Sequence, residues 1–197
     1  ADGDKTEPSN YRPITLLGMD YRLLAKVLVQ RLNPLLDSLI DIQQSAFVPG
    51  RRMGDNIWLL QYLALRLKNL DKSVIAVCCD FQKAYDTVDR GFLFDVLNRM
   101  KLGTGFIRWV RLLLSTTKAA AVVNGQVDTL RTFFAGVRQG CPLSPALFLF
   151  IAHALTCFLK EHKLYIEVDG CRLTGPQHAD DLTALLDNID QVATFKA

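Results

Sequence analysis

Gln177-His178-Ala179-Asp180-Asp181, followed at once by the apolar stretch Leu182-Thr183-Ala184-Leu185-Leu186, is the most informative part of the chain. The pattern predicts two adjacent carboxylates at a turn beside a buried strand. Two negative charges are costly to hold together there unless a positive charge lies between them, and a divalent cation commonly fills that role. A lone Asp-Asp pair is more often a solvated turn. Other segments of the chain must therefore show whether this pair binds a metal.

A third carboxylate, Asp80, ends another apolar run, Val74–Cys79, which is typical of a buried strand. Two acidic strand ends far apart in sequence suggest one metal site built by the fold. Phosphoryl transfer commonly uses two Mg²⁺ ions held by aspartates, and Mg²⁺ keeps several waters, so few carboxylates are needed. We therefore expect Asp80 and Asp180 to be metal ligands, with Asp181 as a weaker third.

The composition is that of a globular chain with an uneven charge distribution. Its 197 residues, 50% hydrophobic, suffice for one well-buried domain or a domain plus a subdomain. The net charge of +3 divides into −3 over residues 160–197 and +6 over residues 1–159. That division fits a polyanion held over a cation site, and it also fits ordinary surface charge.

The cysteines and the hydropathy favour an intracellular protein with no membrane partner. The five cysteines are an odd number without a Cys-x-x-Cys pair, which disfavours a disulfide framework or a zinc site. We see no signal peptide, and the most apolar candidate span, Pro145–Leu159, is short for a membrane crossing. Nothing in the sequence indicates an oligomer.

Local signals predict an α+β fold with an antiparallel sheet. The expected helices are Leu23–Leu36, one capped by Asp55, one capped by Asp89 and ending near Met100, one from Thr104 to about Leu114, and one opened by Ser144-Pro145. Asn124-Gly125 and Asp169-Gly170 suit the hairpin turns that need positive φ. They predict hairpins over Val122–Val127 and Tyr165–Leu173.

Several segments together resemble the motifs of reverse transcriptases. Asp80–Val88 (DFQKAYDTV) resembles their first catalytic motif, and Gly136–Phe148 (GVRQGCPLSPALF) resembles the next one closely. His178–Asp181 (HADD) falls where the family has an aromatic residue followed by Ala-Asp-Asp. Asn10–Ile14 (NYRPI) and Gln44–Gly50 (QSAFVPG) are similar to the fingers-region motifs. The order and spacing are most like non-LTR (LINE-type) retrotransposon enzymes, over residues 7–187.

The resemblance implies a right-hand polymerase fold made of fingers and palm. Residues 1–73 would be fingers-like and residues 74–197 palm-like, with an antiparallel palm sheet packed with helices and the thumb absent. Asp80, Asp180 and Asp181 match the catalytic, metal-binding aspartates, and the backbone carbonyl of Phe81 would complete one metal's shell. The implied cofactor is a pair of Mg²⁺ ions, with Mn²⁺ as a substitute.

The same motifs imply residues that bind the nucleotide. Tyr85 matches the residue under the incoming sugar, where an aromatic face excludes a 2′-hydroxyl; core packing is its alternative role. Gln139 and Gly140 match residues that line the nucleotide and template, since glycine allows close approach to a base pair. Asp86, in the same motif as Tyr85, is expected to hold structure rather than metal.

Three arginines and one histidine are candidates for contacts with phosphates and primer. By motif, Arg12 would contact the triphosphate, whereas Arg51 and Arg52 would grip template phosphates, which suit the guanidinium fork. Arginines in loops are otherwise solvated. His178 replaces the aromatic residue that normally packs near the primer terminus. It is either a tolerated substitution or a metal ligand or proton donor.

The expected function is that of an RNA-directed DNA polymerase domain of a retrotransposon. Its partners would be an RNA template, a DNA primer and dNTPs, and target-primed synthesis at nicked chromosomal DNA would place it in the nucleus. One alternative is an inactive, truncated remnant that at most binds nucleic acid. Another is a different palm polymerase, such as a group II intron maturase or an RNA-dependent RNA polymerase.

Overall fold

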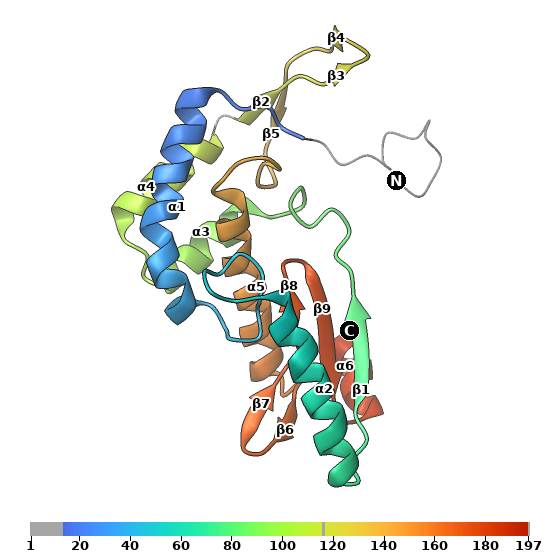
Figure 1. The fold of residues 1–197 in the computed structure, drawn as a ribbon. Helices are drawn as coiled ribbons and strands as arrows, with labels where there is room; N and C mark the ends of the chain where they lie inside the picture. Colours follow the sequence, from blue (N-terminus) through green and yellow to red (C-terminus); the bar gives the residue numbers. More distant parts are fainter. Residues whose placement is uncertain (1–13, 116, 197) are drawn as a thin grey trace.

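The computed structural model describes residues 14–115 and 117–196, apart from the side chain of residue 196. The helices are α1 Met19–Leu39, α2 Met53–Asn69, α3 Arg90–Arg99, α4 Thr104–Ser115, α5 Ser144–Glu161 and α6 Ile189–Lys196. The strands are β1 Ile75–Cys79, β2 Thr117–Ala119, β3 Val122–Val123, β4 Gln126–Val127, β5 Arg131–Phe133, β6 Ile166–Val168, β7 Cys171–Leu173, β8 Gln177–His178 and β9 Asp181–Leu186. Figure 1 shows that they form two regions joined by α5.

The helical region consists of α1, α3, α4 and the first half of α5. Each helix contributes apolar residues at helical spacing, such as Leu28 and Leu32 on α1 and Leu93 and Leu97 on α3. These side chains and those of α5, including Leu149, form one continuous buried cluster. The helical region is therefore held together mainly by the hydrophobic effect.

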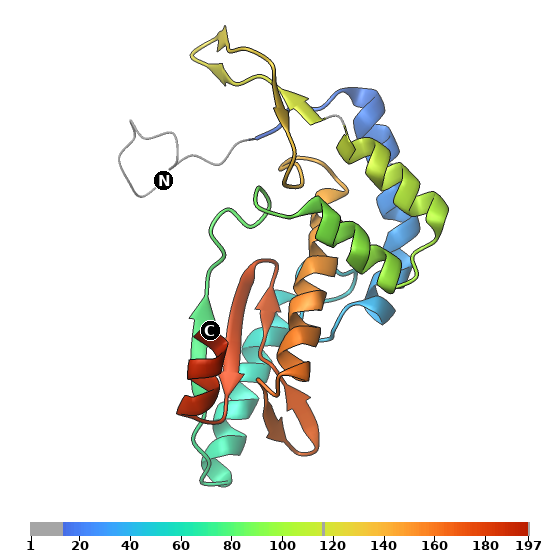
Figure 2. The same ribbon diagram turned by 180° about the vertical axis from the view of Figure 1, so that it is seen from behind.

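The sheet region is built on three antiparallel strands in the order β1-β9-β8. The alternate residues of the central strand β9 point to opposite sides of the sheet, and both faces are covered. Leu182 and Leu186 pack with Leu159 of α5 and with α6, whereas Leu185 packs with Leu63 of α2 and the β6–β7 hairpin. Figures 1 and 2 show α2 and α6 on opposite faces of the sheet.

The helix α5 runs through both regions and is longer than the apolar span considered in the sequence. Ser144–Glu161 has the length and composition of a membrane-crossing helix, but half of this segment is buried inside the protein. Its buried residues include Leu147, Phe150 and Leu159. The described residues contain one such helix, and its packing is that of a core helix.

The local predictions agree with the structure at most points. The structure combines helices with antiparallel strand pairs as expected, and both hairpins form with positive φ at Asn124-Gly125 and Asp169-Gly170. Asp89 caps α3 by accepting a hydrogen bond of 2.6 Å from the Phe92 backbone N–H. The first helix extends beyond both predicted ends, to Met19–Leu39.

Two predicted caps are wrong. Asp55 is the third residue of α2 rather than its cap, and its carboxylate accepts the backbone N–H of Arg52, which is the N-cap residue. Ser144 is the first residue of α5, and Leu143 precedes it as an N-cap without a side-chain hydrogen bond. Pro145 explains why the helix still begins there, because its fixed φ suits the first turn and it has no N–H to satisfy.

Candidate functional site

The three predicted aspartates lie at one end of the sheet. The β1–β9 pairing ends at Cys79 and Leu182, so the next positions in the same register are Asp80 and Asp181. His178 pairs with Asp181 across the β8–β9 hairpin, which leaves Ala179 and Asp180 as its two-residue turn. The fold therefore brings together carboxylates that are 100 residues apart in sequence.

The carboxylates are accessible and uncommitted. Asp80 and Asp181 are exposed and Asp180 is half-buried. Among the described residues, none of the three accepts a hydrogen bond or forms an ion pair. Carboxylate oxygens of this kind are suitable ligands for Mg²⁺, which fills its remaining coordination positions with water. The described part of the chain nevertheless holds no group of three or more acidic, histidine or cysteine side chains arranged around a metal position.

Tyr85 lies between the core and the aspartate turn. Its ring stacks on Phe148 of α5 at 4.9 Å between centroids and 16° between planes. Burial and, secondarily, the negative charge of Asp180 raise the pKa of Tyr85 to about 12. The phenol is therefore neutral at physiological pH and close enough to Asp180 to sense its charge. Tyr85 therefore packs against the core and also lies near the aspartate turn.

Gly136–Cys141 lies along the segment that follows β1. Gly136 and Val137 donate backbone hydrogen bonds to the carbonyls of Val88 and Tyr85, at 2.8 and 2.7 Å. A Cβ on Gly136 would lie 2.7 Å from the Asp86 carbonyl oxygen, and φ is +80°, so glycine is required here. The Gln139 amide donates to both carboxylate oxygens of Asp86 at 3.3 Å. Asp86 thus holds Gln139 in place.

Gly140 has a close neighbour within the protein. A Cβ there would lie 2.9 Å from the carbonyl oxygen of Thr15, whose N–H donates to the Gln139 carbonyl at 3.0 Å. The close approach that this glycine permits in the structure is to Thr15, in the segment before α1. Approach to a base pair remains a separate prediction.

The Arg51 side chain makes its hydrogen bonds within the protein. Its guanidinium donates to the carbonyl oxygens of Asp37, Ile40, Asp41 and Gln44 and to the Asp37 carboxylate. The side chain is only 12% exposed. These bonds use all five N–H groups, so Arg51 has none left for a template phosphate in this arrangement. Arg52 is exposed, and Arg12 lies outside the described residues.

The α1–α2 loop, residues 40–52, contacts the aspartate hairpin directly. Ser45 Oγ lies 2.9 Å from His178 Nδ1, and the Ser45 N–H donates to the Gln177 carbonyl at 3.0 Å. The Asn56 amide of α2 donates to Ser45 Oγ and to the same carbonyl, at 2.9 and 2.8 Å. His178 is half-buried in this network, which gives it a structural anchor.

Gln44 makes the most extensive of these contacts, and sequence reasoning assigned it no role. Its Oε1 accepts the N–H of Ala179 at 2.9 Å, and its Nε2 donates to the carbonyl oxygen of Ala179 at 3.1 Å. Gln44 is 1% exposed. The available signal was its position in a recognised motif, but the partner is 135 residues away along the chain.

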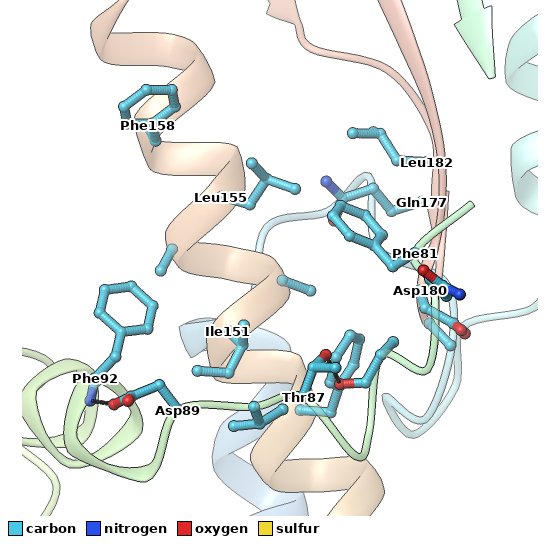
Figure 3. A pocket seen from close by; sticks show the side chains of 17 residues that line it. Phe81, Thr87, Asp89, Phe92, Ile151, Leu155, Phe158, Gln177, Asp180 and Leu182 are labelled. Atoms are coloured by element: carbon cyan, nitrogen blue, oxygen red, sulfur yellow. Dashed lines mark hydrogen bonds between the residues drawn. The ribbon is translucent and has the colours of Figure 1, made fainter. Parts of the chain in front are cut away.

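A cavity of about 400 Å³ opens beside the turn. Figure 3 shows its apolar wall on α5, formed by Ile151, Leu155 and Phe158, with Phe81 and Leu182 on the sheet side. Asp180 also lines it. The aspartate turn is therefore bordered by an apolar surface rather than by basic side chains.

Comparison with known proteins identifies the family. The family described as reverse transcriptase (RNA-dependent DNA polymerase) matches residues 3–196. The chain is 30% identical over 182 residues to the transposon TX1 uncharacterized 149 kDa protein of Xenopus laevis, covering 91% of this chain and 14% of that protein. It is 30% identical over 189 residues to a Pol polyprotein from the type-1 retrotransposable element R2 of Popillia japonica, covering 95% and 26%.

Solved structures show the same fold. Apo telomerase from Candida tropicalis, truncated from its C-terminal domain, superposes with a TM-score of 0.60 at 18% identity, covering 89% of this chain and 36% of that one. Telomerase from Candida albicans, in complex with a fragment of telomeric RNA, gives 0.57 at 14% identity, covering 88% and 31%. The chain spans less than two thirds of each of these proteins. It belongs to the reverse transcriptase family, and its relatives include proteins of non-LTR retrotransposons.

Proposed function

We propose that the chain contributes the catalytic part of an RNA-directed DNA polymerase that adds deoxynucleotides to a primer 3′-hydroxyl. The main observation is that the ends of β1 and β9 bring Asp80, Asp180 and Asp181 to one edge of the sheet beside Tyr85. In this proposal residues 1–73 act as fingers and residues 74–197 as palm. The similarity to R2 polyproteins and to telomerase supports RNA as the template.

Each residue has a role that its surroundings permit. The oxygens of Asp80 and Asp180, with Asp181 and the Phe81 carbonyl beside them, would hold two Mg²⁺ ions or Mn²⁺. When bound, these ions supply neutralisation and alignment of the attacking and leaving oxygens. The Tyr85 ring, fixed against Phe148, presents a rigid face to the sugar and leaves no room for a 2′-hydroxyl.

The remaining candidates would act on the nucleotide and the nucleic acid. Gln139, oriented by Asp86, would contact the incoming dNTP together with Gly140 and Arg12. Arg52 is exposed and would contact the template backbone. His178 would lie near the primer terminus, on the hairpin that carries Asp180. Target-primed synthesis would place the protein in the nucleus.

Primer extension on a homopolymer RNA template tests the proposal. Asp180→Asn should lower dNTP incorporation by about a thousandfold, because metal ions supply several kcal/mol of transition-state stabilisation. Asp95→Asn, an exposed aspartate on α3, is the matched control and should retain activity. Equal and negligible incorporation by the unmodified chain and Asp180→Asn would instead favour an inactive remnant.

The choice of nucleotide separates this proposal from another palm polymerase. The ring of Tyr85 should make the enzyme prefer dNTPs over rNTPs. Tyr85→Ala should raise rNTP incorporation relative to dNTP incorporation while the protein stays folded, as circular dichroism would check. Unchanged selectivity in Tyr85→Ala would remove Tyr85 from the sugar-selecting role.

A further inference from the structure

We propose that Gln44 is a positioning residue, which fixes the main chain next to Asp180 and thereby sets the location of its carboxylate. This inference rests on the proposed function for its catalytic consequence, but its structural content can be tested without any activity. Gln44 lies in the α1–α2 loop, whereas Asp180 lies on the β8–β9 turn.

A single side-chain amide satisfies both polar main-chain groups of the turn residue Ala179. Gln44 Oε1 accepts from Ala179 N, and Gln44 Nε2 donates to Ala179 O. The same Oε1 also accepts the N–H of Ala46 at 3.0 Å, which fixes the amide from its own loop. The main chains run side by side as well, through an isolated bridge between Gln44 and Gln177.

The turn needs such support because Ala179 has an unfavourable conformation. Its φ is +57°, in the left-handed region where a Cβ is crowded by the following carbonyl. In a two-residue hairpin turn the exposed main-chain groups usually bond only to water. Here the carbonyl held by Gln44 belongs to the peptide plane that joins Ala179 to Asp180. Fixing that plane fixes where the Asp180 side chain begins.

Gln44 is in turn anchored to the helical region. Arg51 donates to the Gln44 carbonyl at 2.9 Å and to the carbonyls at the end of α1. Asp41, in the same loop, forms an ion pair with Lys160 of α5. The position of the aspartate turn is therefore defined relative to α1 and α5 as well as to the sheet.

Hydrogen exchange followed by NMR on the full chain tests the contact itself. Gln44→Met keeps a similar volume but removes both bonds, so the Ala179 amide should exchange about tenfold faster, as expected for losing one net hydrogen bond. The amides of the β1–β9 ladder should be unaffected. Asn56→Ala, which removes bonds to Ser45 and Gln177 but none to Ala179, is the matched control.

A rescue experiment distinguishes a positioning role of Gln44 from a general contribution to loop packing. In polymerase assays Gln44→Met should lower the maximal rate with little change in the KM for dNTP. Ala179→Gly added to Gln44→Met should restore part of that rate, because glycine accepts positive φ without strain. A loss caused only by poorer loop packing would not respond to a change at Ala179. If Met disturbs folding, Gln44→Asn retains an amide but is one methylene shorter, so it should no longer reach the Ala179 N–H.

The outcomes separate this inference from the proposed function. An unchanged Ala179 exchange rate in a folded Gln44→Met or Gln44→Asn variant would overturn the inference, whatever the activity. Selectively faster exchange in a chain that shows no polymerase activity would support the contact and count against the function. Faster exchange without rescue by Ala179→Gly would overturn the positioning role.

Discussion

The helical region and the sheet region hold their parts together by different means. The helical region shares one continuous apolar cluster, whereas the sheet has two smaller clusters on opposite faces of β9. The end of the sheet that carries the aspartates depends on polar contacts from the α1–α2 loop, notably those of Gln44, Ser45 and Arg51. Packing thus forms the scaffold, and directional hydrogen bonds locate the site.

This division suits a site that must present charge to solvent. An apolar core could not surround Asp80, Asp180 and Asp181 without a large desolvation cost. Hydrogen bonds to the main chain hold the turn while leaving its carboxylates free. The price is that the geometry depends on a few buried polar side chains that have no substitute.

Core truncations should produce the largest stability effect and test whether the two regions are cooperative. Leu97→Ala on α3 removes a fully buried side chain and should cost about 2–5 kcal/mol in unfolding free energy. Leu186→Ala on β9, also fully buried but in a smaller cluster, should fall toward the lower end of that range. Because α5 belongs to both regions, both variants should shift one common transition in urea.

Leu112→Ala, at a side chain that is 59% exposed, is the control for the core truncations and should change stability little. Two separate transitions, each moved by only one of the truncations, would show that the regions unfold independently. The helical region and the sheet region would then be two separate domains.

Replacing Arg51 should have an intermediate effect on stability. Lysine cannot reproduce the forked bonds to several carbonyls, so Arg51→Lys should destabilise the protein by about 1–3 kcal/mol in thermal or urea unfolding. RNA affinity at moderate salt should be unchanged. The exposed Arg52→Lys is the matched control for stability. Weaker RNA binding by Arg51→Lys at unaltered stability would restore Arg51 as a template contact.

The smallest effect concerns the ionisation of Tyr85, measured from tyrosinate absorbance with Tyr85→Phe to assign the signal. Asp180→Asn removes the secondary cause of the raised pKa, so it should bring the pKa from about 12 part of the way toward 10.0. The folded-state pKa is raised, so the stabilising contribution of the neutral phenol is complete below pH 10.0 and declines as pH rises toward 12. An unaltered pKa would place Asp180 away from the phenol.

Features with a local cause were predictable from the sequence. Asn124-Gly125 and Asp169-Gly170 supply positive φ at a hairpin turn, and both hairpins form. Asp89 caps its helix through a bond to a residue three positions away. The apolar runs around Val77 and Ala184 predict two strands, and both form. Only β9 is buried as expected, because β1 lies at the edge of the sheet and none of its residues is fully buried. Together with the motifs, these runs placed the aspartates at one end of the sheet.

Features that depend on distant partners were not predictable in the same way. Gln44 bonds a turn 135 residues away, so nothing near it in the sequence reveals its partner. Arg51 has the sequence context of a solvated loop arginine, yet the end of α1 and the loop that follows it together occupy all its donors. Ser144 precedes a proline as a cap often does, but the helix begins one residue earlier than that pattern predicts.

The passage of α5 through both regions has a consequence for how the chain tolerates length changes. Phe148, near its start, supports Tyr85, and Leu159, near its end, packs against β9. One inserted residue would rotate everything beyond it by about 100° and advance it by about 1.5 Å. An exposed connection such as residues 128–130, between β4 and β5, can absorb an insertion locally, whereas α5 would convert it into a misalignment between the two halves. This helix therefore fixes the distance and orientation between the Tyr85 side and the sheet side of the protein.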